Sequence, residues 1–189
     1  MTMTDPVRND NAKAGSPALR IANGIGFVLD RVAMVIAISA VIAIFIALML
    51  EVTIRYMTQA GLGWPNEVPN LLFPWLIMGG IVLGAQRGSH IAAEAIRGFL
   101  STEQLRMLLS FIHLLVAVSF AYLAFLSLQV IQITRTQVFP MTGLGQAWAY
   151  SSLLFGFGGI ALASLVNLVR VVFTDDPRTL HQPEPEHTL

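Results

Sequence analysis

The chain has 189 residues, of which 55% are hydrophobic and only 12% are charged. A soluble domain carries about 25% charged residues, so this composition indicates that lipid is the main solvent of the protein. Basic and acidic residues number 11 each, so net charge argues neither for nor against a polyanionic partner. The absence of cysteine excludes disulfides, thiolate metal sites and thiol chemistry.

The N-terminal segment is polar and rich in small residues, and we expect residues 1–20 to be flexible. Ser16 and Pro17 within it are typical of an N-cap followed by a first helical turn. Residues 21–31 place apolar side chains at helical spacing among charged ones, which predicts an amphipathic lead-in at the membrane interface. It is not a cleavable signal peptide, because the apolar run is too long and no small-residue cleavage site follows.

Four apolar stretches are long enough to cross a bilayer: residues 32–50, 68–85, 107–134 and 147–169. A hydrocarbon core about 30 Å thick requires roughly 20 helical residues. Pro74 should bend the second span. The pattern predicts an all-α membrane protein with four transmembrane helices in a single domain, residues 21–173. We expect the tail, residues 174–189, to be disordered, since it is rich in acidic residues and proline.

The basic residues are distributed unequally between the two sides of the predicted spans. One side has Arg8, Lys13, Arg20, Arg31, Arg87, Arg97, Arg106, Arg170 and Arg178. The other side has Arg55 and Arg135 alone. The positive-inside rule therefore predicts that both termini and the middle loop of this multi-pass membrane protein are cytoplasmic.

The middle loop carries its own local signals. Residues 90–100 have one broad apolar face opposite a charged pair, which predicts a short amphipathic helix along the cytoplasmic interface after the second span ends near Gln86. Ser101 and Gln104 then have the spacing of a capping box, which predicts that the third helix starts at Thr102.

No residue pattern indicates an active site or a cofactor. His90 and His113 are the only histidines outside the C-terminal tail. A haem in a helical bundle needs facing histidines at membrane depth, and a zinc site needs clustered ligands, so we expect neither cofactor and no enzymatic activity. We interpret His113 as an interhelical hydrogen-bonding residue.

The span cores lack Asp, Glu, Lys and Arg, although an ion pathway normally needs an ionisable group at membrane depth. This argues against a four-helix transporter that works alone. We interpret the remaining polar residues as interhelical hydrogen-bonding groups; they are Gln129, Gln132 and Asn167. We interpret the glycines as close helix-packing positions; they are Gly79, Gly80, Gly84, Gly156, Gly158 and Gly159.

Charged and aromatic residues mark the span ends. Glu51 and Arg55 are spaced i,i+4 where the first span ends, as in an ion pair reaching toward the interface. Glu67 opens the second span, where a carboxylate favours the helix dipole. Trp64 fits an interfacial anchor. These charged and aromatic residues could in addition form the contact with a partner subunit.

Several short motifs occur in a characteristic order: "IRY" (54–56), "WPNEV" (64–68), "QRGSHI" (86–91), "LST" (100–102) and "WAY" (148–150). In order and spacing they resemble the small integral membrane subunit (DctQ-like) of TRAP transporters, the tripartite ATP-independent periplasmic uptake systems of bacteria. The similarity runs from about residue 28 to 172. Two departures from the family pattern are present. Asn66 stands where the family has the first of two adjacent acids, and Gln146 and Ser152 stand where it often has prolines.

The resemblance implies four transmembrane helices paired with a much larger subunit that carries substrate and sodium. It also implies a soluble periplasmic binding protein that delivers an organic acid. The candidate residues for subunit contact or membrane anchoring are Arg55, Trp64, Glu67, Arg87, His90 and Trp148. The implied function is that of a non-catalytic scaffold. The alternative is a stand-alone exporter or channel that forms a homo-oligomer.

Overall fold

The structure is a computed structural model that describes residues 17–96 and 101–173. Its elements in chain order are α2 (Pro17–Thr58), the short 3-10 helix η2 (Trp64–Asn66), α3 (Val68–Ile96), α4 (Thr102–Thr134) and α5 (Gln146–Phe173). Within these described ranges, four helices are long and apolar enough to cross a membrane, as the sequence predicts. The helices extend beyond the predicted apolar stretches, and α2 with 42 residues is the longest.

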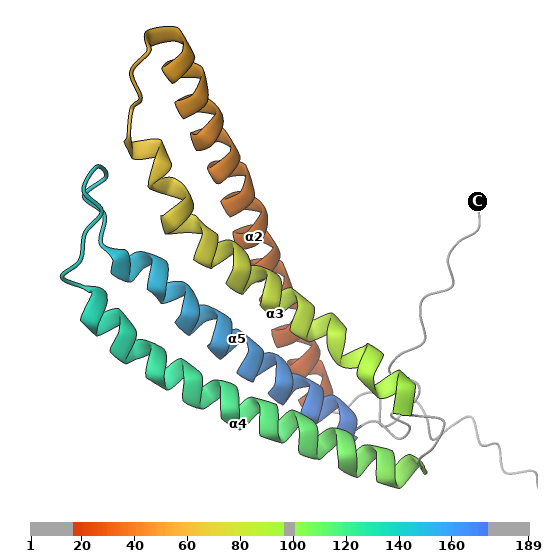
Figure 1. The fold of residues 1–189 in the computed structure, drawn as a ribbon. Helices are drawn as coiled ribbons and strands as arrows, with labels where there is room; N and C mark the ends of the chain where they lie inside the picture. The colour runs from red at the N-terminus through yellow and green to blue at the C-terminus, as the bar shows by residue number, and fades with distance from the viewer. Residues whose placement is uncertain (1–16, 97–100, 174–189) are drawn as a thin grey trace, which may run out of the picture.

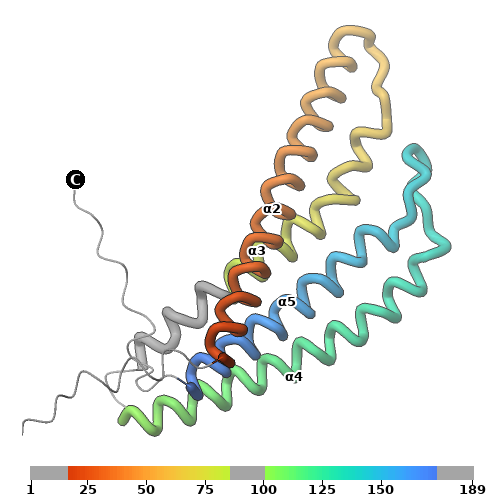
Figure 2. The backbone as a smooth tube through the Cα atoms, turned by 180° about the vertical axis from the view of Figure 1, so that it is seen from behind, coloured from red at the N-terminus to blue at the C-terminus, as the bar shows by residue number. Residues whose placement is uncertain are grey.

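The four helices form two antiparallel pairs, α2 with α3 and α4 with α5 (Figure 1). The pairs converge where α2 begins and α5 ends, here called the terminal end, and diverge toward the two connecting loops, here called the loop end. The view from behind shows the same divergence (Figure 2). α5 packs against all three other helices and is the most buried of the four.

A stripe of small side chains lets α2 approach its neighbours closely. Its buried residues are Ala22, Gly26, Ala33, Ala40, Ala47 and Glu51, which recur at helical spacing along one face. The core at this contact is formed by Ala33, Val82 and Ile160 from three different helices. Small residues at such contacts allow backbones in a membrane to approach and gain van der Waals contact. The opposite face of α2 is apolar and exposed, as expected of a surface that meets lipid.

The glycines divide into two groups. A Cβ atom on Gly79 would lie 3.0 Å from the Ala33 carbonyl oxygen of α2. Side chains of α3 would similarly crowd a Cβ atom on Gly156 or Gly159 of α5. These three positions confirm the predicted close packing.

Gly80, Gly84 and Gly158 have no atom within 4 Å of such a Cβ position, so the prediction is wrong for contacts within the described part of the chain. Helical periodicity explains the difference. Neighbouring positions on a helix point to different faces, and only some of those faces meet another helix.

Two predicted boundaries differ from the structure. Residues 17–20, assigned to the flexible N-terminus, form the first turn of α2. Proline is well suited to a first helical position, which explains the early start. Of the predicted helix over residues 90–100, residues 90–96 are the last turns of an uninterrupted α3 and do not form a separate helix, and residues 97–100 lie outside the described residues. The helix α3 continues because no proline follows Pro74 within it. The location of residues 90–96 at a membrane interface stays a prediction.

The start of α4 is set locally, as predicted. The Gln104 N–H donates to the Ser101 hydroxyl oxygen, and the Ser101 N–H donates to the Gln104 side-chain oxygen, which completes a capping box. The helix begins at Thr102. Its first turns pack against the last turns of α5 through Leu105, Leu109 and Val171.

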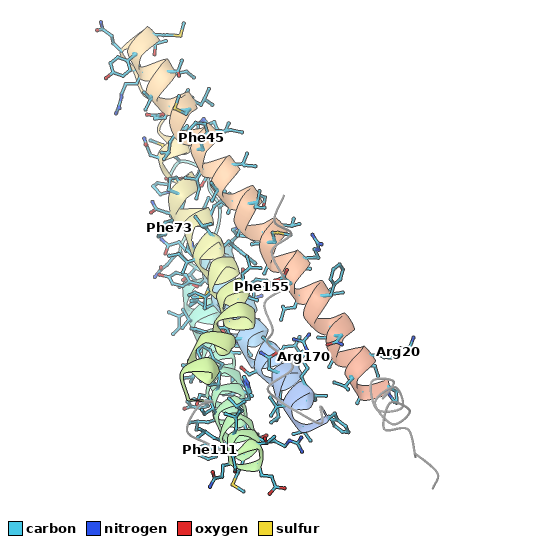
Figure 3. All side chains as sticks on the ribbon, turned by 90° about the vertical axis from the view of Figure 1, so that its right-hand side faces the viewer. Arg20, Phe45, Phe73, Phe111, Phe155 and Arg170 are labelled. Carbon is cyan, nitrogen blue, oxygen red and sulfur yellow. The ribbon has the colours of Figure 1, made fainter. Side chains whose placement is uncertain are left out.

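A polar contact joins α2 to α5 at the terminal end. The Arg170 guanidinium donates from Nε to the Asn23 side-chain oxygen (3.0 Å) and from Nη1 to that of Asn167 (3.2 Å). Asn167 is buried, but its hydrogen bond with Arg170 joins two residues of α5, so the interpretation of Asn167 as an interhelical group stays a prediction. Figure 3 shows Arg170 on α5 and Arg20 on α2 near this end.

Candidate functional site

The loop between α4 and α5 folds back as a small hairpin. Val138 and Gly145 form an antiparallel bridge, and the Phe139 N–H donates to the Leu144 carbonyl oxygen at 2.9 Å. Gly143 has a φ of 66°, a conformation that glycine adopts without steric cost. The tip of this loop, Met141 and Thr142, therefore projects from the α4/α5 pair as a structured element.

Glu67 binds this tip from the other helical pair. Its carboxylate accepts hydrogen bonds from the Met141 N–H (2.9 Å), the Thr142 N–H (2.8 Å) and the Thr142 hydroxyl (2.8 Å). The Glu67 carbonyl oxygen accepts from the Leu71 N–H, in the first turn of α3. Glu67 is 9% exposed. The main role of Glu67 is thus to join the two connecting loops. Its partners are 74 and 75 residues away in the sequence, so the prediction based on the helix dipole did not reveal this contact.

Glu51 performs a similar task for the loop between α2 and α3. Its carboxylate accepts from the Leu62 N–H (3.0 Å) and from the Asn66 side-chain amide (3.2 Å). Glu51 is 4% exposed, whereas Arg55 is exposed. The predicted ion pair between Glu51 and Arg55 is not formed, because the loop supplies closer donors to the buried carboxylate.

The short loop requires glycine at two positions. A Cβ atom on Gly61 would lie 2.5 Å from a Glu51 carboxylate oxygen, so a larger residue would displace the acid from its donors. Gly63 precedes η2 with a φ of 79°, and a Cβ atom there would lie 2.9 Å from the Met141 Cε atom. The two loops therefore touch at Gly63 and Met141 as well as through Glu67. We call Glu51, Asn66, Glu67 and Thr142 the loop-end junction.

Asn66 is the position that departs from the paired-acid pattern, and in this chain its side chain is part of the junction. The amide at this position donates to Glu51. A carboxylate in its place would set two like charges against each other at a hydrogen-bonding distance. The amide thus matches a buried acid at Glu51.

The variant Asn66→Asp is expected to destabilise the purified protein by about 1–3 kcal/mol, because it replaces a hydrogen bond to a buried carboxylate with charge repulsion. Asn70→Asp makes the same chemical change four residues later, where the side chain is exposed like that of Asn66 but forms no hydrogen bond with the described residues, and it should have an effect within about 0.5 kcal/mol. Thermal unfolding in detergent measures both. Equal midpoints for the two variants would contradict the role given to Asn66.

An aromatic cluster lies below the junction, between α3 and α5. The Trp75 and Trp148 rings lie 5.3 Å apart between centroids, and the Trp75 indole N–H donates to the Trp148 carbonyl oxygen at 3.1 Å. Phe155 follows at 6.0 Å from Trp75. Sequence reasoning singled out Trp148 but missed Trp75, although a tryptophan near the start of a span is a recognisable signal of an interfacial residue.

The structure brings together only some of the predicted site residues. Glu67 is in the junction, and Trp64 opens η2 beside it with 40% of its surface exposed. Trp148 packs on Trp75 but remains 56% exposed. Arg55 lies at the end of α2 with its side chain exposed. The remaining two residues, Arg87 and His90, lie in the continuous part of α3, and their side chains fall outside the described residues.

The two buried carboxylates of the junction are engaged in hydrogen bonds within the chain. The Glu51 and Glu67 carboxylates accept hydrogen bonds from the chain itself. Within the described ranges, no three His, Cys, Asp or Glu residues lie close enough to hold a metal ion. His113 is buried in α4, 8% exposed, far along the helix from the junction.

The fold and the junction together define a small multi-pass α-helical membrane protein. The family model for tripartite ATP-independent periplasmic transporters, DctQ component, matches residues 44–174. The chain belongs to this family, and its role is that of a transporter subunit.

Two curated relatives are consistent with this assignment. A putative TRAP transporter small permease protein of Haemophilus influenzae is 24% identical over 138 residues, which cover 73% of this chain and 81% of the relative. An uncharacterized protein of Sinorhizobium fredii is 30% identical over 132 residues, 69% of this chain but only 24% of that protein. This chain therefore spans about a quarter of the length of the second relative.

Proposed function

We propose that this chain is the non-catalytic small subunit of a sodium-driven, binding-protein-dependent TRAP transporter. It scaffolds a larger multi-spanning subunit in the bacterial inner membrane during uptake of an organic acid such as a carboxylate. The loop end faces the periplasm, where the soluble binding protein delivers substrate. Both termini face the cytoplasm, in agreement with the excess of basic residues at the terminal end.

The observation that carries this proposal is that both buried carboxylates are occupied by hydrogen bonds within the chain. Glu51 and Glu67 accept hydrogen bonds from loops of the same chain. A subunit that moved ions itself would need ionisable groups open to an ion or a proton at membrane depth. A subunit that stays fixed while its partner moves needs joined loops and close helix contacts, and these are the features that support the scaffold.

The exposed residues at the ends of the helices are the proposed contacts to the partner or to the membrane interface. Arg55, Trp64 and Trp148 are exposed near the loop end. Arg87 and His90 follow the second span toward the terminal end. If these arginines hold the partner, Arg55→Ala combined with Arg87→Ala will reduce both complex yield and uptake. Unchanged yield and uptake would show that the arginines are not contacts.

Affinity purification of the tagged chain from native membranes in mild detergent, followed by mass spectrometry, tests the proposed function. The expected result is a stoichiometric multi-spanning membrane protein that is larger than this chain. Recovery of this chain alone, as a defined homo-oligomer that moves solute in liposomes, would overturn the scaffold and favour the exporter.

A further inference from the structure

The outward face of α4 carries polar side chains that form no hydrogen bond with the described residues of the chain. Gln129 and Gln132 are both exposed, although the sequence predicted that they bond to neighbouring helices. Within the part of the chain that the structure describes, no hydrogen bond is formed by either side-chain amide. The prediction of interhelical hydrogen bonds is therefore wrong for these two glutamines within the described part of the chain.

These glutamines belong to one stripe with two aromatic residues. Tyr122, Phe125, Gln129 and Gln132 are spaced at three, four and three residues, which places them on one side of a helix. Tyr122 is 62% exposed and Phe125 is 61% exposed. We call these four residues the amide stripe. Phe111 and Val118, which precede these residues on the same side of α4, are apolar.

Both glutamines lie in the last two turns of α4, a helix long and apolar enough to cross a membrane. The neighbours of both glutamines along the helix are apolar, and Ile133, which lies beyond them, is 70% exposed. An exposed isoleucine beside the glutamines is suited to hydrocarbon. Acyl chains cannot hydrogen-bond, so a side-chain amide that faces them loses the partners it has in water.

A transmembrane helix with its own hydrogen-bonding side chains would satisfy the amides. Glutamine side chains do join helices in membranes in this way, and the flanking Tyr122 and Phe125 rings add apolar contact area. No described neighbour covers this face, since α4 packs mainly on α5, through buried residues on its other side.

We propose that the amide stripe of α4 is the surface on which a transmembrane helix of the large transporter subunit packs, with hydrogen bonds to Gln129 and Gln132. This inference rests on the proposed function, because it takes the large subunit as the partner. It names the contact face, which neither the family nor the helix-end residues specify.

Photochemical cross-linking in native membranes tests the face directly. The chain lacks cysteine, so Phe125→Cys can be labelled at a single site of this subunit with a benzophenone maleimide. Phe45→Cys is the matched control, because Phe45 lies on α2 and is 63% exposed (Figure 3). The unsubstituted chain, treated identically, gives the background. The expected result is an adduct with the large subunit from position 125 and none above background from position 45.

A pair of substitutions tests the amides themselves. Gln129→Leu combined with Gln132→Leu should lower the affinity of the complex by about tenfold, and leucine should leave the isolated chain folded in lipid. Gln137→Leu makes the same change in the exposed loop and should leave the affinity unchanged.

The outcomes separate this inference from the proposed function. If the unsubstituted chain co-purifies with the large subunit but the adduct forms from position 45, or equally from both positions, the face is wrong and the scaffold stands. An adduct between two copies of this chain from position 125 would replace the proposed partner with a second copy. Failure of the unsubstituted chain to retain any large subunit would overturn both.

Discussion

Replacing Glu67 with alanine is expected to release the α4–α5 loop from the α2/α3 pair. The substitution removes the acceptor of three hydrogen bonds and leaves the Met141 and Thr142 donors without it. Hydrogen bonds to a charged group are among the stronger ones in proteins, so hydrogen exchange at the Met141 and Thr142 amides should quicken by at least about tenfold. Hydrogen exchange followed by mass spectrometry of the loop peptide measures this.

The effect should be confined to the loop end. The contacts of Leu105 and Leu109 with Val171 lie at the opposite end of the helices and do not depend on Glu67, so exchange there should stay unchanged. Thr142→Val removes the hydroxyl donor but keeps both N–H donors, and it should give a smaller increase than Glu67→Ala. If hydrogen exchange in the loop stayed slow in Glu67→Ala, the hairpin would be stable without Glu67, and Glu67 would not join the two helical pairs.

Enlarging Gly156 is expected to force α3 and α5 apart. A Cβ atom at this position would lie 2.8 Å from the Met78 Cβ atom, which is held by the α3 backbone and cannot rotate away. Overpacking of this kind costs about 1–3 kcal/mol. Gly156→Val should therefore lower the free energy of unfolding by about 2 kcal/mol or more, measured by denaturation in a lipid–detergent mixture.

Gly158 provides the matched control two residues along the same helix. Nothing lies within 4 Å of a Cβ atom built there, so Gly158→Val should change stability by no more than about 1 kcal/mol, the scale of helix propensity differences. If the two variants were equally destabilised, the cost would come from the helix backbone, and the close contact between α3 and α5 would not be its source.

Much of the architecture could be predicted from local patterns. The four spans follow from runs of apolar residues that exceed the thickness of a bilayer. The start of α4 follows from Ser101 and Gln104, whose contacts are only three residues apart. The family resemblance follows from short motifs in a set order, and the match to residues 44–174 confirms it. Each of these properties depends on residues close together in the chain.

The loop-end junction could not be predicted in the same way. Glu67 was identified as a candidate, but its partners lie 74 and 75 residues away in another loop. Glu51 was paired with Arg55 because a helix pattern shows only contacts between residues three or four positions apart. Its actual partners, Leu62 and Asn66, come close only because the chain turns back after α2.

The sequence by itself was enough to infer that the protein lies mainly in lipid, how many spans it has and to which family it belongs. These depend on side-chain hydrophobicity summed along contiguous residues, and on motif order. Only the tertiary structure showed which glycines pack against another helix, which carboxylates accept hydrogen bonds from the loops and which glutamines face outward. Each of these depends on the side of a helix that lies against another helix, and that side is set by the packing of the whole bundle.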